Sequence, residues 1–272
     1  MRRETMRRRF HTSADVWLHH HPLPPIPHKG DLIAIVDGLW FTLRKRRYTV
    51  MVILIRSTQE LVAIPAVMWL VAGGESRAHW HRAFSKLPRA TQERIVAVVA
   101  DGATPLLGYV RSRGWQFQWC HAHMKRKMME LRGLRALPGQ QIRKQVMGHA
   151  FQFLDTPDER VASLHQHALQ NLFQDPQCPP SIRKRLSGLI RRSELLRTFA
   201  RVPAYNLPTT TNSVEQVNFQ VREVFGRIRG TRTRTSLRWW LRLLHHATQP
   251  IACRGFRQTI KPNTEFYRIN GS

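Results

Sequence analysis

The sequence contains few cysteines, few acidic residues and no long apolar run. Its three cysteines, Cys120, Cys178 and Cys253, are widely spaced, so they form neither a disulfide framework nor a Cys-x-x-Cys zinc ribbon. This usage fits a reducing compartment, and we expect a cytoplasmic protein. Every apolar run is short or interrupted by charge, and no apolar stretch follows the basic first nine residues. We therefore expect neither a membrane span nor a signal peptide.

The charge of the chain is strongly one-sided. The 272 residues include 44 Lys and Arg but only 17 Asp and Glu, which gives a formal net charge of +27. Solubility does not require so large an excess, and the simplest partner for such a chain is a polyanion, most directly a nucleic acid. The length is sufficient for one large domain or for a domain with an insertion.

Residues 1–30 are predicted to be a basic, proline-rich arm. Four prolines lie within residues 22–27, and such a run forms neither a helix nor a central strand. We expect the histidine triplet at residues 19–21 to lie in a solvated loop, because three adjacent histidines do not make a preformed metal site.

Apolar, β-branched runs predict a sheet in the next part of the chain. Residues 31–68 contain three such runs joined by short polar turns, which predicts three antiparallel strands. The periodicity then predicts, in order, a helix at residues 75–87, a buried strand at 94–101, a helix from Thr104 and an alternating strand at 115–120. Helical patterns dominate from residue 121 to 201, and a further helix follows Thr211.

Three acidic residues stand out from these elements. Asp37 interrupts the buried run from Ile33 to Phe41, and no basic residue is nearer in sequence than Arg44. An unpaired buried carboxylate costs several kcal/mol, so either the strand turns into solvent at this point or a metal ion compensates the charge. Asp101 ends a later buried strand in the same way. Glu215 lies in the first turn of a late helix, where an acid can simply complement the helix dipole.

Four sequence blocks carry a resemblance to a known family. They are VDG at 36–38, ADG at 100–102, WCHAHMKR at 119–126 and TNSVEQVN at 211–218. With these blocks in this order, the chain resembles the DDE transposases of the Mutator-like group of insertion-sequence transposases, over roughly residues 31–244. The resemblance implies an α/β, ribonuclease-H-like fold. In that fold a mixed sheet of three antiparallel strands plus parallel strands is flanked by helices, and an all-α insertion precedes the last catalytic helix.

The resemblance also implies a division of the chain. Proteins of this group usually carry an N-terminal helical or zinc-containing domain that recognises the terminal repeats of the element, and the arm is too short to hold one. The expected parts are the arm (1–30), the first part of the core (31–120), the helical insertion (121–207), the catalytic and closing helices of the core (208–250) and a basic tail (251–272).

The resemblance implies that Asp37, Asp101 and Glu215 are the catalytic acids, separated by 64 and 114 residues. Two divalent ions, Mg²⁺ or Mn²⁺, about 3.5 to 4 Å apart would stabilise the attacking and leaving oxygens of a phosphodiester. Asp37 would bridge both ions, and Asp101 and Glu215 would each complete one. Activated water would nick the element end, and the freed 3′-hydroxyl would attack target DNA. Glu223 is a second acid on the last helix, two turns further from the strand ends.

Cys120 and His123 match the Cys-x-x-His signature of the family, which implies a role beside the active site. The alternatives are a buried Cys120 with a hydrogen-bonded His123, or zinc binding together with His121, for which no fourth ligand is evident. Trp239 and Trp240 could stack on a flipped base, although two aromatics on an amphipathic helix usually belong to a core. Further residues expected to contact DNA or to support the site are Lys125, Arg126, Asn212, Asn218 and Arg222.

Three functions are compatible with the sequence. The first is a DDE transposase that binds element ends and target DNA, as a homodimer or higher oligomer. The second is a catalytically inactive, transposase-derived DNA-binding protein, which the presence of all three acids argues against. The third is a ribonuclease-H-like nuclease or resolvase that cuts strands without joining them.

Overall fold

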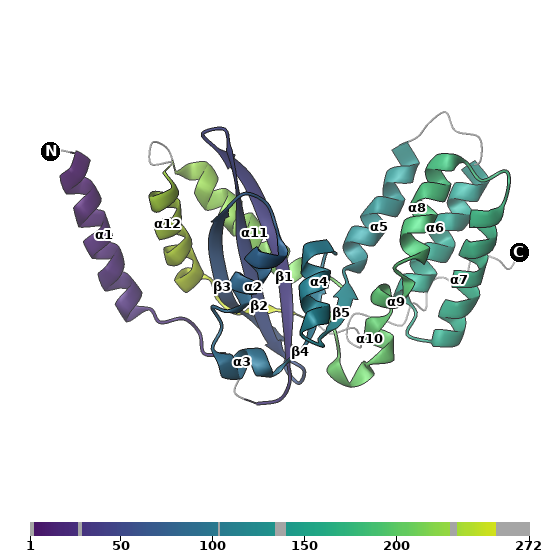
Figure 1. Ribbon diagram of the computed structural model, residues 1–272, viewed down its shortest axis with the longest axis horizontal. Helices are drawn as coiled ribbons and strands as arrows, with labels where there is room; N and C mark the ends of the chain where they lie inside the picture. Colours follow the sequence, from purple (N-terminus) through teal and green to yellow (C-terminus); the bar gives the residue numbers. More distant parts are fainter. Residues whose placement is uncertain (1–2, 27–28, 103, 134–139, 229–232, 254–272) are drawn as a thin grey trace, which may run out of the picture.

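A six-stranded mixed sheet organises the fold in the computed structural model (Figure 1), which describes residues 3–26, 29–102, 104–133, 140–228 and 233–253. The strand order is β5-β4-β1-β2-β3-β6. The strands are β1 (Leu32–Leu43), β2 (Arg46–Ser57), β3 (Val62–Ala72), β4 (Ile95–Ala100), β5 (Gln116–Trp119) and β6 (Ile251–Ala252).

The connections explain which strands are antiparallel. Between β1 and β2 only Arg44 and Lys45 intervene, both at positive φ (49° and 64°), and a two-residue turn of this kind joins antiparallel neighbours. β2 and β3 are also antiparallel, whereas β4 is parallel to β1 and β5 is parallel to β4. The predicted mixed sheet flanked by helices is therefore confirmed. β6, which was not predicted, lies at the start of the expected basic tail; residues 254–272 of that tail lie outside the described residues.

Helices cover both faces of the sheet and form a separate helical region beyond β5 (Figure 1). Within the described ranges no helix is long and apolar enough to cross a membrane. The helices are α1 (Arg3–His20), α2 (Arg77–Phe84), α3 (Arg89–Glu93), α4 (Thr104–Ser112), α5 (His121–Met129), α6 (Gln140–Asp155), α7 (Glu159–Gln174), α8 (Pro180–Ile190), α9 (Ser193–Leu196), α10 (Thr198–Arg201), α11 (Asn212–Arg227) and α12 (Arg234–Ala247).

Alternating side chains of β1 belong to two different cores. Leu32, Ala34 and Val36 face α2 and α4, whereas Ile33 and Ile35 face α11 and α12. Successive side chains of a strand point to opposite faces, so the continuously apolar run is explained by burial on both sides. Because Asp37 has the parity of Ile35, its side chain lies on the α11 face.

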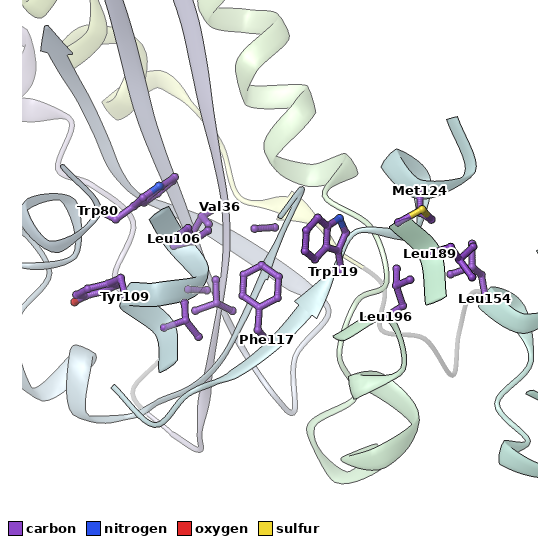
Figure 2. Close-up of a cluster of buried hydrophobic side chains, with 14 of the residues drawn as sticks. Val36, Trp80, Leu106, Tyr109, Phe117, Trp119, Met124, Leu154, Leu189 and Leu196 are labelled. Atoms are coloured by element: carbon purple, nitrogen blue, oxygen red, sulfur yellow. The ribbon is translucent and has the colours of Figure 1, made fainter. Parts of the chain in front are cut away.

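The core on the α2 and α4 face continues into the helical region. Figure 2 shows Trp119, at the end of β5, between Phe117 of the sheet and the apolar side chains of Met124 and Leu189 in α5 and α8. The helical region expected at residues 121–207 therefore shares its core with the sheet, and its helices α5 to α10 follow β5 directly.

The first segment differs from the expected arm. Residues 3–20 form α1, in which Ala14 and Leu18 are buried. The histidine triplet was expected in a solvated loop, but His19 and His20 form the last turn of this helix. The expectation was wrong because the prolines begin only at Pro22, so they end the helix without affecting the preceding residues, most of which tolerate a helix well.

Trp239 and Trp240 of α12 explain what α1 packs against. The Trp239 ring stacks on His11 at 4.8 Å between centroids, and the Trp240 ring lies 5.2 Å from Phe10. The two indoles thus hold one helix against another, which favours the packing interpretation over base stacking.

Candidate active site

The two aspartates lie on the neighbouring central strands β1 and β4, Asp37 within β1 and Asp101 just after β4. β1 and β4 are parallel, with Ile35 opposite Val99, and extending that register by two residues places Asp37 opposite Asp101. Asp101 directly follows the last residue of β4. Both positions have the parity that faces α11. The predicted juxtaposition of Asp37 and Asp101 thus follows from the strand pairing alone.

A buried asparagine connects Asp37 to α11. Asn218 Nδ2 donates a hydrogen bond of 2.6 Å to Asp37 Oδ2, while the backbone N–H of Gly38 donates to Asp37 Oδ1 at 2.8 Å. Asn218 is only 4 % exposed, and its Oδ1 has no hydrogen-bond partner among the described residues. α11 is held in place by a buried valine stripe that packs on the sheet: Val214, Val217 and Val221.

The carboxyl of Asp37 lies in the field of the other two acids. Its pKa is raised to about 6, first because burial disfavours the charged form and next because the charge of Asp101 repels it. Glu215 raises the pKa slightly further, whereas the Gly38 N–H and His123 lower it. The charges of Asp101 and Glu215 therefore both act on the carboxyl of Asp37.

Glu215 occupies the first turn of α11 and is surrounded by donors and cations. Thr211 Oγ1 donates to Glu215 Oε1 at 3.3 Å. His123 Nδ1 lies 3.7 Å from Oε1, and an Arg126 guanidinium nitrogen lies 3.9 Å from Oε2. The half-buried carboxylate is thus held at the site from the sides of both α5 and α11.

Cys120 and His123 form a hydrogen-bonded cluster with Thr211. His123 Nδ1 and Thr211 Oγ1 lie 3.3 and 3.2 Å from Cys120 Sγ, to which the Thr211 N–H donates at 3.4 Å. Burial alone would raise the pKa of Cys120, but the hydrogen bonds from His123 and Thr211 outweigh it and lower the pKa overall. The bond to Cys120 raises the pKa of His123, against the opposing effect of burial. His123 therefore lies beside both the buried sulfur of Cys120 and the carboxylate of Glu215.

The third zinc candidate, His121, has a different environment. It is buried, its Nε2 donates to the Leu196 carbonyl at 2.7 Å, and burial lowers its pKa to about 3. Across the described part of the chain, no three His, Cys, Asp or Glu side chains are arranged to hold a metal ion as they stand.

The three acids offer the kind of ligand atoms that a divalent cation binds. Asp37, Asp101 and Glu215 supply hard carboxylate oxygens, the donors that Mg²⁺ and Mn²⁺ take. A cation would relieve the repulsion that raises the pKa of Asp37. The buried Oδ1 of Asn218, which lacks a donor, adds a further hard oxygen.

The other candidates divide between the site and the surface. Arg126 lies beside Glu215, whereas Lys125 Nζ instead forms an ion pair of 2.6 Å with Asp155 of α6. Asn212 is exposed at the start of α11, and Arg222 is exposed in its second half, where it lines a cavity together with Trp40 and Phe225. Glu223, the alternative acid, is exposed and paired with Arg227 at 2.7 Å.

Close packing explains the glycines that follow both aspartates. A Cβ at Gly38 would lie 2.4 Å from Oε1 of Glu75, and a Cβ at Gly102 would lie 1.8 Å from the Trp119 ring. Gly102 also has a φ of +94°, which favours glycine. Gly102 is therefore required by its backbone and by Trp119, whereas a side chain at position 38 would have to displace the Glu75 carboxyl.

Glu75 is an acid of this region that the sequence did not single out. It precedes α2, and its Oε2 accepts a hydrogen bond of 3.2 Å from Trp80 Nε1. Its pKa is raised to about 7, first by burial and then by the charges of Asp101 and Asp37. The sequence alone indicates only that Glu75 begins a helix, because no known motif spacing relates it to Asp37 or Asp101.

Comparison with known proteins does not assign the chain to a family. No protein-family model matches it, and no curated protein is significantly similar to it. The candidate site therefore rests on the sequence blocks and on the geometry described above.

Proposed function

We propose that the chain is a DDE transposase with a ribonuclease-H-like core, which cleaves DNA strands and joins a 3′-hydroxyl end to target DNA. The observation that carries the proposal is the grouping of Asp37, Asp101 and Glu215 in one environment, with Asn218 tying Asp37 to the helix of Glu215. The strand order, with three antiparallel strands followed by two parallel ones, is the order expected for that fold.

The chemistry assigned to the acids is metal-assisted phosphoryl transfer. Two bound divalent ions would supply charge stabilisation for the attacking and leaving oxygens of an in-line displacement. Asp37, Asp101 and Glu215 are the residues that would hold them. The protein residues orient these ligands: Asn218 and the Gly38 N–H fix Asp37, and Thr211 fixes Glu215.

The cations near the acids offer a path for the DNA backbone. α5 leads from His123 and Arg126, beside Glu215, into a cleft between α5 and α8. The net charge of +27 supports phosphate contacts along such a path, because cation–phosphate pairing supplies most sequence-independent affinity. The basic residues that line the cleft are Lys127, Lys184, Arg185, Arg191 and Arg192.

The test uses a supercoiled plasmid and a labelled duplex with a free 3′-hydroxyl. A transposase nicks the plasmid in Mg²⁺ or Mn²⁺ and joins the labelled strand to it, whereas a nuclease or resolvase only nicks. A protein that binds the plasmid but neither nicks nor joins would be the inactive relative. Asp37→Asn, Asp101→Asn and Glu215→Gln should each abolish both reactions, and the exposed Glu223→Gln should leave them intact.

A further inference from the structure

Glu75 occupies space beside Asp37 that a side chain at position 38 would fill. The nearest atoms to a Cβ built at Gly38 all belong to Glu75: Oε1 at 2.4 Å, Cδ at 2.5 Å and Cγ at 2.8 Å. Gly38 directly follows Asp37 on β1 and points to the opposite face of the sheet. The carboxyl of Glu75 therefore approaches the same strand position from the α2 side.

This carboxyl has a fixed position, and Arg47 attracts it less strongly than the two neighbouring aspartates repel it. Trp80 Nε1 donates to its Oε2 at 3.2 Å, and Trp80 itself is buried in the core beneath α2. No Lys or Arg of the described residues lies within ion-pair distance of Glu75. The charges that act on it most are those of Asp101 and Asp37, and both repel it. A half-buried carboxylate that two others repel is unfavourable unless a cation compensates their charge.

A second observation concerns the α11 side of Asp37. Asn218, whose Nδ2 donates to Asp37, has a buried Oδ1 without a donor among the described residues. An unsatisfied buried acceptor is costly and rare, and a bound cation, or water held by one, would satisfy it. Asp37 thus has the Asn218 amide on its α11 side and, next to the following residue Gly38, the Glu75 carboxyl on the side of the loop before α2.

We propose that Glu75 is a fourth carboxylate of the divalent-ion site, which holds an ion together with Asp37 and Asp101 from the α2 side of the sheet. The proposal rests on the proposed function, because it adds a ligand to the same site. It also gives Gly38 a function: the missing side chain makes room for a metal ligand. In the alternative, Glu75 would only accept the hydrogen bond of Trp80.

Metal binding can be measured without any DNA or activity. Mn²⁺ is titrated into the protein and followed by isothermal calorimetry and by the loss of the free-Mn²⁺ electron paramagnetic resonance signal. Glu75→Gln should bind the ion at least roughly tenfold more weakly, on the scale of the 10- to 100-fold losses seen when groups around a metal site are removed. The matched control is Glu60→Gln, which changes an exposed glutamate in the turn between β2 and β3 and should bind as the wild type does.

The variants separate the inference from the proposed function. If Asp37→Asn loses Mn²⁺ binding but Glu75→Gln binds as the wild type does, Glu75 is only structural and the inference fails alone. If the wild type binds no Mn²⁺, or if Asp37→Asn binds it unchanged, the metal site of the proposed function fails as well. Glu75→Gln keeps an oxygen for Trp80 and removes a buried charge, so its metal-free melting temperature should not fall.

A second pair of variants tests the geometry itself. Gly38→Ala places a methyl group where Glu75 lies, so it should displace that carboxyl and weaken Mn²⁺ binding as Glu75→Gln does. Adding Glu75→Ala removes the clash, so the double variant should regain melting temperature but not Mn²⁺ affinity. Recovery of Mn²⁺ affinity in the double variant would overturn the proposal.

Discussion

Replacing Asp37 with asparagine should stabilise the metal-free protein at alkaline pH. Burial and the charge of Asp101 raise the pKa of Asp37 from 3.8 to about 6. Well below pH 3.8, the ordinary pKa of the group, the carboxyl is protonated in both the folded and the unfolded protein. As the pH rises toward 6, the unfolded protein loses the proton first, so the folded protein loses relative stability. Above pH 6 the carboxyl is charged in both states, and the folded protein bears the full loss of stability caused by this buried charge.

The magnitude follows from the same values. At 1.36 kcal/mol per pKa unit, the difference between 3.8 and about 6 corresponds to ~3 kcal/mol, and relaxation of neighbouring groups makes this an upper limit. The asparagine keeps an oxygen for the Gly38 N–H. Its amide can donate to Asn218, provided that Asn218 turns its own amide so that the unsatisfied Oδ1 accepts.

The assay is urea denaturation in the presence of a chelator, at pH 8 and at pH 4. We expect Asp37→Asn to be about 1 to 3 kcal/mol more stable than the wild type at pH 8 and nearly equal to it at pH 4. Glu223→Gln, whose target is exposed and paired with Arg227, is the control and should change little at either pH. A variant that is less stable at pH 8, or that shows the same gain at both pH values, would refute the electrostatic argument.

Three other predictions concern the cluster beside Glu215, the charge and the buried histidine. His123→Ala should reduce strand cleavage with little change in melting temperature, whereas a packing role alone would loosen the fold by about 1 to 3 kcal/mol and reduce activity only in proportion. Binding to element ends and to random duplex should be similar and should fall steeply with salt, with a log–log slope of about −0.9 per phosphate contacted, and a strong preference for one terminal sequence in competition would contradict this. Because the pKa of His121 is lowered to about 3 from 6.5, the unfolded protein binds a proton that the folded protein does not, so folding stability should fall by ~2 kcal/mol between pH 7 and pH 5. His121→Gln should remove that part of the pH dependence in urea denaturation.

The strands and the acid pair could be predicted because their signals are local. The runs that become β1, β2 and β4 are apolar and β-branched, and short turns fix which neighbours are antiparallel. Asp37 and Asp101 each interrupt or end such a run. Once β1 and β4 pair in parallel, the register of the two strands places Asp37 next to Asp101.

Glu75 and α1 could not be predicted in the same way. The position of Glu75 depends on the space left by Gly38 and on the hydrogen bond to Trp80, which bring together the loop before α2 and the middle of β1. α1 carries few apolar residues, and the face that it buries is defined only by its contacts with the indoles of α12. Both features depend on tertiary contacts between segments that are distant in sequence.

The Cys-x-x-His block shows how a large helical region can precede Glu215 without displacing it. Cys120 N–H donates to the Ala100 carbonyl at 2.8 Å, and His121 N–H donates to the Thr209 carbonyl at 2.7 Å, so the end of β5 is bonded both to β4 and to the segment before α11. Thr211 then links Cys120 Sγ to Glu215.

The far end of the helical region returns to the same strand. Thr198 Oγ1 donates to the Phe117 carbonyl at 2.6 Å, and the Phe199 N–H donates to the Gln118 side chain at 2.8 Å. Since both ends of the region are attached to β5, its internal length does not affect where α11 begins. The position of Glu215 relative to Asp101 is therefore set by β5 and its Cys-x-x-His continuation, so substitutions at Cys120 should act on the chemistry through Thr211 and Glu215.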